Sequence, residues 1–570
     1  MVLIRFQIIL VITMDNLRFI LLFTLGIIIY QLSLYWEMDY GPKQDPVVQE
    51  QPVPESTQPG VDLPDTEPTS DSSVIVGDQE RIHDAKHQPS DSKTPDIRNT
   101  HILVNTDVFR IEIDSSGTIV VLDLLEYPVS KEQSDIPLKL FQQTKEDWFT
   151  AQSGLMSRKG SASNHQSVYR FEQESYVLNP GEAMLRVPLH WSNGKGIEIT
   201  KTFIFSRNSY LIDLEQTVKN NSDEIWTGSQ YEQLQRNQGE SGDDSTFIRT
   251  YKGGVIYSEA EKYEKISFDD MRDANLKREV NGGWVAMIQH YFLAAWIPPG
   301  NEKNKFYTIS LPDERFVIGS YSPSVKVEPG DTFVFKSKLF VGPKIQSVME
   351  ETAKGLELTV DYGILTVIGK PIFWLLDKFH GIVGNWGFAI MMVTLVIKAI
   401  FFPLSAASYR SMAKMRKLQP KLQALKERYE DDKPRFNQEM MALYRTEKVN
   451  PLGGCLPILV QIPVFISLYW VLMETVELRQ APFILWINDL SVKDPYYILP
   501  LLMGLSMWIQ QRLNPTPVDP VQEKVMKLFP FIFTVFFLWF PAGLVLYWVV
   551  NNSLSILQQW YITRKIEQDH

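Results

Sequence analysis

A basic residue, Lys398, lies inside a long apolar segment in the C-terminal third of the sequence, within the run MMVTLVIKAIFFP. An ionised side chain at the centre of a membrane helix costs about 3 kcal/mol on insertion scales, so such a residue faces a polar cavity by default. We therefore predict a functional cation here, with Thr394 one helical turn earlier on the same face. The alternative is that Lys398 has no functional role and extends its ammonium along the helix to the cytoplasmic lipid headgroups.

Polar side chains also interrupt the later apolar segments. Gln461 lies in the second, Thr534 in the fourth and Asn551 in the fifth of these segments. Asn552 and Ser553 follow directly. A lone interhelical hydrogen bond is the commoner role of each such residue. Together with the lysine, they predict a polar hollow whose positive charge would attract acidic groups. Apolar faces adjoin it, for which lipid contact is the simpler interpretation: Ile458, Ile462, Phe465, Phe533, Phe536 and Phe537.

No catalytic or metal-binding motif is recognisable in the sequence. The eight histidines are scattered without metal-site spacing, and one cysteine, Cys455, cannot form an internal disulfide or a cysteine metal cage. There is no nucleophile elbow and no glycine-rich phosphate loop. We therefore predict a protein that is not an enzyme, with no cofactor, no metal and no nucleotide. The net charge of −11 argues against nucleic acid as the main partner.

Apolar residues gather at the two ends of the chain, although the mean hydropathy of −0.13 resembles that of a soluble protein. Residues 17–36 (LRFILLFTLGIIIYQLSLYW) have the length and the terminal aromatic residues of a membrane span. No small-residue cleavage site follows, so 14–36 is predicted to be an uncleaved signal anchor. Residues 1–13 are too short to span, and we interpret them as an extension ahead of the true start. Residues 37–96, rich in Pro, Ser, Asp, Glu and Gln, are predicted to be a disordered linker.

Residues 97–343 have a different pattern. Short runs alternate apolar with polar residues, as in VFRIEID, GIEITKTFIFS and TFVFKSKLFV, and Gly, Asn, Asp and Pro separate them. This pattern predicts an all-β domain, a sandwich, on the outer side of the membrane. Residues 344–380 are predicted to connect it to the membrane, with a helix over 344–356 and an amphipathic helix over 362–380 that lies in the interface.

Residues 381–561 contain the remaining predicted spans: 381–404, 455–473, 496–513 and 529–561. The last contains Pro541-Ala542-Gly543, which could be a kink in one helix or a turn between two. Residues 405–452 carry eleven Lys and Arg against six Asp and Glu, so this segment is predicted to be cytoplasmic. The segment 474–494 is predicted to lie on the outer side of the membrane. If the last apolar segment divides into two spans, the total with the signal anchor is six, and the tail, 562–570, is cytoplasmic.

The cytoplasmic segment has helical composition in two stretches, 412–430 and 434–448, separated by Asp431-Asp432-Lys433. Pro434 suits a first helical position. We therefore predict a helical hairpin within 405–452 that docks a partner, because a structured excursion of about forty residues is unusual between spans. The simpler alternative is a solvated, charge-rich loop. The basic residues singled out are Arg416, Lys417, Lys421, Lys426 and Arg428.

Long stretches of this region resemble the bacterial YidC insertases of the YidC/Oxa/Alb family. They include GNWGFAIMMVTLVIKAIFFPLSAASYRSMAKMRKLQPK, EKVNPLGGCLPILVQIPVFISLYW, ELRQAPFILWINDLSVKDPYYILP and FFLWFPAGLVLYW, and the similarity runs from about 362 to 562. The N-terminal run MDNLR also resembles the family's usual start. The resemblance implies a polytopic α-helical protein of six spans, of the Gram-negative type, with a periplasmic β-supersandwich domain and a hairpin at Pro541-Ala542-Gly543.

The same resemblance implies a membrane protein insertase and chaperone with a hydrophilic groove open to the cytoplasm and to lipid. Its cation falls at Lys398, where most members carry arginine, so the bidentate fork that grips a carboxylate is missing here. By analogy, clients slide past Ile462, Pro463 and Phe536. The implied setting is the bacterial inner membrane with both termini cytoplasmic. The implied partners are nascent inner-membrane proteins, the Sec translocon, the ribosome and the lipid bilayer.

Two other functions compete with this interpretation. A transporter or channel would also hold an intramembrane cation, but the spans show no inverted repeat, and a β domain and a cytoplasmic hairpin fit a transporter poorly. A sugar-processing role for the β domain would need an acid–base pair, and the sequence does not single one out. A fold alone does not imply a function.

Overall fold

The computed structural model describes residues 101–157, 162–239, 250–429, 432–447, 449, 456–514 and 520–568. The chain divides into two compact units, 1–61 and 62–570, and every described residue belongs to the second. The predictions for 1–13, for the signal anchor at 14–36 and for the linker at 37–96 therefore lie outside the described residues.

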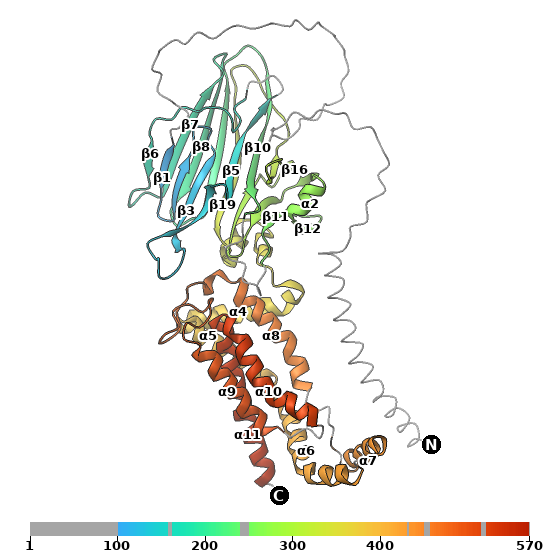
Figure 1. Cartoon of the computed structure of the whole chain (residues 1–570). Coiled ribbons are helices and arrows are strands. Elements are labelled where there is room, and N and C mark those ends of the chain that lie inside the picture. Colours follow the sequence, from blue (N-terminus) through green and yellow to red (C-terminus); the bar gives the residue numbers. More distant parts are fainter. Residues whose placement is uncertain are drawn as a thin grey trace, which may run out of the picture. The chain divides into compact units, whose positions relative to one another are not determined.

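Two large sheets form the N-terminal part of the described chain (Figure 1). The first sheet has eleven strands: β1 Ile102–Asn105, β2 Phe109–Ile113, β3 Ile119–Pro128, β4 Pro137–Gln143, β5 Trp148–Ser157, β6 Ser175–Val177, β10 Trp226–Asn237, β13 Lys277–Asn281, β16 Lys303–Ser310, β17 Arg315–Tyr321 and β18 Val325–Val327. The second has eight: β7 Met184–Ser192, β8 Ile197–Ser206, β9 Leu211–Asn220, β11 Gly253–Ser258, β12 Lys262–Ile266, β14 Trp284–Ile288, β15 Phe292–Ile297 and β19 Thr332–Pro343. The prediction of an all-β sandwich is confirmed at this level.

The pairing is almost wholly antiparallel, with β1 and β6 parallel. Alternation along β9 shows why these sequences form strands. Ile212, Leu214, Gln216 and Val218 turn inward and are buried, whereas the alternate residues Asp213, Glu215 and Thr217 are partly exposed. A short helix, α2 (Phe268–Asp273), begins at a capping box in which the Ser267 side chain and the Asp270 side chain each accept a backbone N–H.

A lysine is fully buried between the two sheets. Lys201 on β8 donates from Nζ to the carbonyl oxygen of Ser153 on β5, 2.7 Å away, and the ammonium lies 4.8 Å from the ring centroid of Tyr169. Burial lowers the pKa of Lys201 to about 7, an effect that the Asp114 carboxylate partly opposes. The sandwich thus holds an ionisable group whose proton is bound more weakly in the folded state than in the unfolded chain.

The C-terminal part is helical. Its elements are α3 Gln346–Thr352, η2 Leu356–Thr359, η3 Gly363–Leu365, α4 Thr366–Val383, α5 Trp386–Ile400, α6 Phe402–Arg428, α7 Lys433–Thr446, α8 Leu456–Glu474, η5 Val476–Leu478, α9 Ile498–Leu513, α10 Pro520–Phe536, η6 Phe537–Trp539 and α11 Ala542–Gln568. The helix expected over 344–356 is shorter than predicted, and the one expected over 362–380 runs from 366 to 383. At Pro541-Ala542-Gly543 the chain turns between two separate helices, α10 and α11.

The helix that follows α5 starts earlier than the sequence pattern indicated. The prediction placed it at 412, whereas α6 begins at Phe402 with Pro403 in its first turn. Proline is well tolerated there because the first N–H groups of a helix have no intrahelical acceptor. Farther along, Leu418 and Leu422 of α6 pack with Tyr444 of α7 in one apolar cluster.

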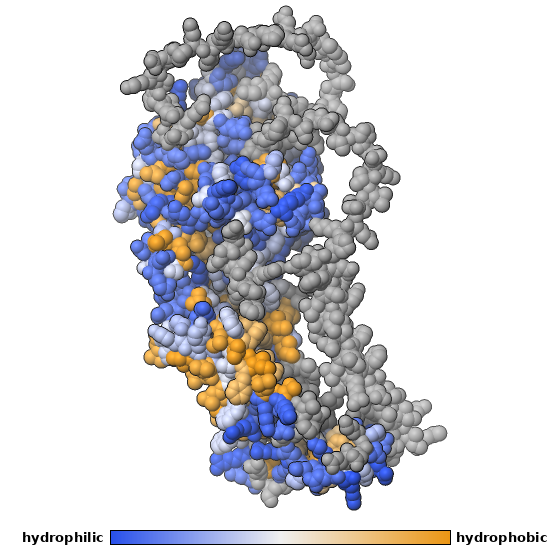
Figure 2. All heavy atoms as spheres, in the orientation of Figure 1, coloured by the Kyte–Doolittle hydropathy of each residue, from blue (hydrophilic) through white to orange (hydrophobic). Residues whose placement is uncertain are grey.

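Many apolar side chains of the helices are exposed. They include Leu395, Ile400, Leu501, Phe531 and Val535. Figure 2 shows such hydrophobic side chains gathered over the helical part. Among the described residues, no single helix combines the length and hydropathy needed to cross a membrane. The pair α5 and α6, bent by 67° at their junction, meets the requirement together.

We expect the β domain to become more stable as the pH rises from about 7 towards the ordinary pKa of lysine. Over this interval the unfolded chain binds a proton at Lys201 that the folded chain does not, so folding gains up to about 2–3 kcal/mol between about pH 7 and about pH 9. Lys201→Met should abolish this increment, whereas Lys219→Met, at an exposed lysine on the adjacent strand, should retain it. Thermal unfolding of the full chain, followed by tryptophan fluorescence at both pH values, measures the difference. An equal pH increment in the Lys201→Met protein would contradict this assignment.

Candidate functional site

Lys398 lies in the last turn of α5 and is half-buried. The helix is capped by Asn385, whose side-chain oxygen accepts the N–H of Phe388 at 3.2 Å. A cation near a helix C-terminus is stabilised by the partial negative charge of the last carbonyl groups. The Nζ atom also donates to Ser555 Oγ on α11 at 2.7 Å. The ammonium is therefore anchored to a second helix.

From Ser555 the polar contacts continue to a third helix. Ser555 Oγ donates to the backbone oxygen of Asn551, one turn earlier on α11, at 2.8 Å. The side-chain oxygen of Asn551 accepts Gln461 Nε2 of α8 at 2.5 Å. We call Lys398, Ser555, Asn551 and Gln461 the polar cluster. Three of the five predicted groove residues thus come together, joined by hydrogen bonds across α5, α11 and α8.

The two predicted threonines are placed differently. Thr394 is fully buried, and its hydroxyl donates to the carbonyl oxygen of Ile390 in its own helix at 2.7 Å. Thr534 on α10 likewise donates to the carbonyl oxygen of Pro530 at 2.7 Å. These hydroxyls are not part of the polar cluster, because each satisfies a backbone oxygen one turn earlier.

Two partners were not predicted from the sequence. Ser555 is the direct acceptor of the lysine, and its position four residues after Asn551 could have indicated a shared helix face. Ser506 on α9 accepts Asn552 Nδ2 of α11 at 3.1 Å, and both residues are buried. An isolated serine in an apolar helix gives no signal of its own, so this contact could not have been found without the fold.

The predicted client-contact residues on α8 and α10 are exposed or half-buried. Ile462 follows Gln461 on α8 and is 45% exposed, because consecutive residues of a helix face different directions. Phe536 on α10 is 42% exposed, and its ring centroid lies 4.8 Å from that of Phe540. Pro463 is half-buried within α8. The region thus offers polar and apolar surface on neighbouring positions.

The basic residues singled out on α6 lie mostly on its exposed surface. Arg416, Lys417, Lys421 and Arg428 are exposed, and Lys426 is half-buried. Lys421 Nζ pairs with Glu447 Oε1 beyond α7 at 2.6 Å, which ties the two helices together. A surface ion pair of this kind adds at most about 1 kcal/mol, so Lys421 can leave Glu447 at little cost.

Among the described residues, no group of three or more His, Cys, Asp or Glu side chains is arranged to hold a metal ion.

Two protein-family models match this chain. The model described as "YidC periplasmic domain" matches residues 101–375, and that described as "60Kd inner membrane protein" matches residues 378–569.

The chain is also similar to curated proteins over nearly its whole length. A membrane protein insertase YidC of Methylococcus capsulatus is 56% identical over 558 residues, which cover 98% of this chain and 99% of that protein. Another, of Nitrosococcus oceani, is 48% identical over 561 residues, covering 98% of this chain and 100% of that protein. Both similarities span the β domain and the helices alike.

One solved structure is described as "Active YidC insertase crystal structure with the first transmembrane domain resolved". The alignment covers 81% of this chain and 93% of the chain in that structure. It is 16% identical, with a TM-score of 0.37. The family assignment rests on the sequences.

We expect Gly504→Ala to weaken the packing of α9 against α10. A Cβ at Gly504 would overlap Thr534 Oγ1 and lie 3.1 Å from Thr534 Cβ, so one helix must shift. Overpacking of this kind costs about 1–3 kcal/mol and should lower the melting temperature of the detergent-solubilised protein. Gly381→Ala on α4, where nothing lies within 4 Å, is the matched control. Adding Thr534→Ala should restore part of the loss; an unchanged melting temperature for Gly504→Ala would show that the two helices are not in close contact.

Proposed function

This chain belongs to the family of YidC membrane protein insertases, and we propose on that basis that its polar cluster is where a polypeptide entering the bilayer meets the protein. As a member of this family, the protein inserts other proteins into the bacterial inner membrane. The proposal for the site is carried by the hydrogen bond of 2.7 Å between Lys398 Nζ and Ser555 Oγ, which holds a cation among largely apolar helices.

The ammonium group of Lys398 has more N–H donors than the described residues accept. An ammonium carries three N–H donors, and one of them is used by Ser555. The others can bind a carboxylate or an unpaired backbone carbonyl of the incoming chain. In surroundings of low dielectric such charge-assisted bonds are stronger than in water. A client therefore exchanges part of its hydration for contacts with Lys398, which lowers the cost of moving its polar segment into the membrane.

The apolar positions complete the proposed groove. Ile462 and Phe536, both partly exposed, and Pro463 would contact the hydrophobic segment of the client while the polar cluster holds its polar groups. Thr394 and Thr534 also belong to the proposed groove. Their hydroxyls donate to carbonyl oxygens within their own helices. An amphipathic site of this kind shelters a segment that suits neither water nor lipid throughout, which is the chaperone part of the function.

We propose a topology of six spans with both termini in the cytoplasm and the β domain, as a supersandwich, in the periplasm. The excess of Lys and Arg over 405–452 supports a cytoplasmic position for that segment. The proposed divisions are an extension at 1–13, a signal anchor at 14–36, a linker at 37–96, the β domain at 97–343, a connection at 344–380, the insertase core at 381–561 and a tail at 562–570. No finding favours a transporter or channel.

We further propose that the basic residues of the hairpin dock the ribosome and that the protein works either alone or beside the Sec translocon. Exposed arginine and lysine side chains on α6 suit the phosphate backbone of ribosomal RNA. The work requires no covalent chemistry and no nucleotide, because the free energy comes from moving apolar client segments out of water.

Lys398→Ala should reduce insertion of a short client with an acidic translocated end by about tenfold or more, the worth of a charge-assisted hydrogen bond. Lys398→Arg should retain insertion because it keeps the charge. The measurement is protease protection of the client end in liposomes that contain this protein alone.

Lys370→Ala, at an exposed lysine on α4, controls for the loss of a positive charge elsewhere, and melting temperatures control for folding. If Lys398→Ala protects the client as well as the unchanged protein does, the polar cluster is not the client site. Absence of protection with the unchanged protein would instead remove the claim that it acts alone.

Reversing three exposed charges of the hairpin, by Arg416→Glu, Lys417→Glu and Arg428→Glu, should weaken co-sedimentation with ribosomes by about tenfold and flatten its salt dependence. The same number of reversals on the β domain, at Lys145, Lys195 and Lys326, should have no effect. Equal losses in both triple variants would show that net charge, and not the hairpin, governs ribosome binding.

A further inference from the structure

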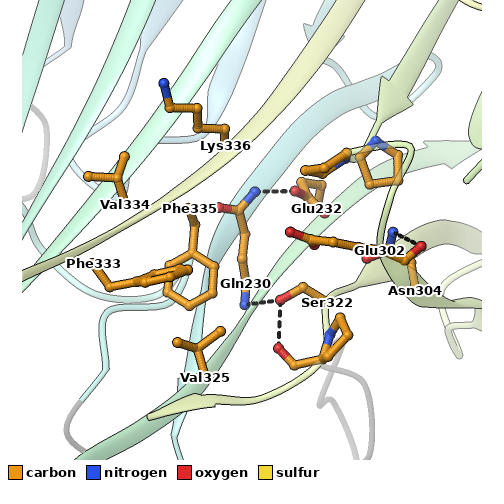
Figure 3. A pocket seen from close by; sticks show the side chains of 13 residues that line it. Gln230, Glu232, Glu302, Asn304, Ser322, Val325, Phe333, Val334, Phe335 and Lys336 are labelled. Carbon is orange, nitrogen blue, oxygen red and sulfur yellow. Dashed lines mark hydrogen bonds between the residues drawn. The ribbon is translucent and has the colours of Figure 1, made fainter. Parts of the chain in front are cut away.

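A cavity of about 340 Å³ opens in the β domain (Figure 3). Its lining comes from both sheets, with Gln230 and Glu232 on β10, Asn304 on β16 and Phe333 and Phe335 on β19. The volume is within the range of small-ligand sites. The cavity lies in a different domain from the polar cluster, so a ligand bound there is independent of the proposed function.

The floor of the cavity presents an unused acceptor. Gln230 is 2% exposed, and its Nε2 donates to Glu232 Oε1. Ser320 Oγ donates to the other oxygen of Glu232 at 3.2 Å. With the amide oriented in this way, Gln230 Oε1 has no hydrogen-bond partner among the described residues, although it is buried. A buried acceptor without a donor destabilises the fold, so it indicates a missing partner.

A second carboxylate faces the same space. Glu302 is half-buried, and the structure shows no hydrogen bond or ion pair from its carboxylate to another described residue. Burial raises its pKa. Burial also raises the pKa of Glu232 to about 7, and the neighbouring Glu302 adds to that rise. When these two carboxyl groups are ionised, no cationic side chain among the described residues pairs with them.

The one basic residue among the lining residues does not supply the missing charge. Lys336 Nζ pairs with Glu215 Oε1 at 3.2 Å, and in Figure 3 its ammonium points away from Gln230, Glu232 and Glu302. The neutral side-chain donors are also used, since Ser322 Oγ donates to the carbonyl oxygen of Pro323 at 3.2 Å and Asn304 Nδ2 donates to the backbone oxygen of Glu302 at 3.4 Å. The cavity therefore has a surplus of acceptors and a deficit of donors.

Apolar groups form the remaining wall. The ring centroids of Phe333 and Phe335 lie 4.8 Å apart with their planes at 72°, and Val325 belongs to the same apolar cluster. Pro298 and Pro299 also line the cavity. Such a wall suits an aliphatic stem, and aromatic faces also attract cations.

We propose that this cavity binds a primary ammonium group carried on an unbranched aliphatic stem. The ammonium would donate to Gln230 Oε1 and the Glu302 carboxylate, and the stem would lie against Phe333 and Phe335. A neutral polyol fits less well, because it would leave two carboxyl groups facing each other without a positive charge. A metal ion fits less well too, since the described residues offer no cluster of three ligands. A free diamine and the lysine side chain of a peptide share this chemistry.

The test is isothermal titration calorimetry on the full chain in detergent micelles. The probes are 1,5-diaminopentane, N-acetyl-lysine N-methylamide and, as the neutral counterpart of the diamine, pentane-1,5-diol. We expect the diamine to bind at least about tenfold more tightly than the diol, because its ammonium makes charge-assisted bonds. Binding of the lysine amide as well would identify a peptide side chain as an acceptable source, and binding of the diamine alone would identify a free amine.

Glu302→Gln keeps the shape of the side chain and should weaken diamine binding by about tenfold or more. Glu172→Gln removes an exposed carboxylate of the same domain outside the cavity and should leave binding unchanged. Unaltered melting temperatures would show that both variants fold. The proposal is overturned if neither amine binds, if the diol binds as tightly as the diamine, or if the two glutamate variants lose binding equally.

Discussion

A positive charge held among largely apolar helices is the constraint on which the helical part depends. Lys398 cannot be hydrated fully where it lies, so neighbouring helices must offer it oxygen atoms. Ser555 does so directly, and Asn551 and Gln461 extend the contact across α11 and α8. The same bonds that stabilise the charge also fix the position of α5 relative to the other two helices. Site and fold are therefore held by one set of interactions.

The β domain handles buried polarity in two ways. Between its sheets, Lys201 is satisfied by the Ser153 carbonyl oxygen and by the ring of Tyr169. In the cavity beside β10, Gln230 Oε1 and the Glu302 carboxylate remain without donors from the described chain. The first arrangement is a closed structural contact, and the second is open to a ligand. Burial alone does not separate the two cases; the presence of an internal partner does.

An insertase must offer a client both kinds of surface at once. In the proposed groove, the polar cluster and the exposed side chains of Ile462 and Phe536 would provide this contrast. A lysine at this position supplies a point charge and not the planar fork of an arginine. A single hydroxyl acceptor such as Ser555 matches the point charge of an ammonium well, since it does not require paired, coplanar acceptors.

Much of the architecture follows from local pattern. Alternation with a period of two predicted the sandwich, and uninterrupted apolar runs predicted the helices that hold Lys398, Gln461 and Asn551. In each segment, the spacing of the apolar residues reflects which face is buried. The local sequence is therefore enough to predict the element. The start of α6 at Phe402 was missed, because Pro403 is compatible with either a loop or a first turn.

Which polar residues meet was decided by the tertiary structure. Thr394 and Lys398 share a helix face, yet Thr394 bonds to its own backbone, and the partner of the lysine, Ser555, lies 157 positions away. The Asn552–Ser506 contact and the open acceptor of Gln230 are equally invisible in the sequence. A hydrogen bond depends on distance and direction between groups from separate elements, and these are set only when the elements pack. The sequence determined which residues carry charge and polarity, and the packing determined which of them are satisfied and which stay free to bind.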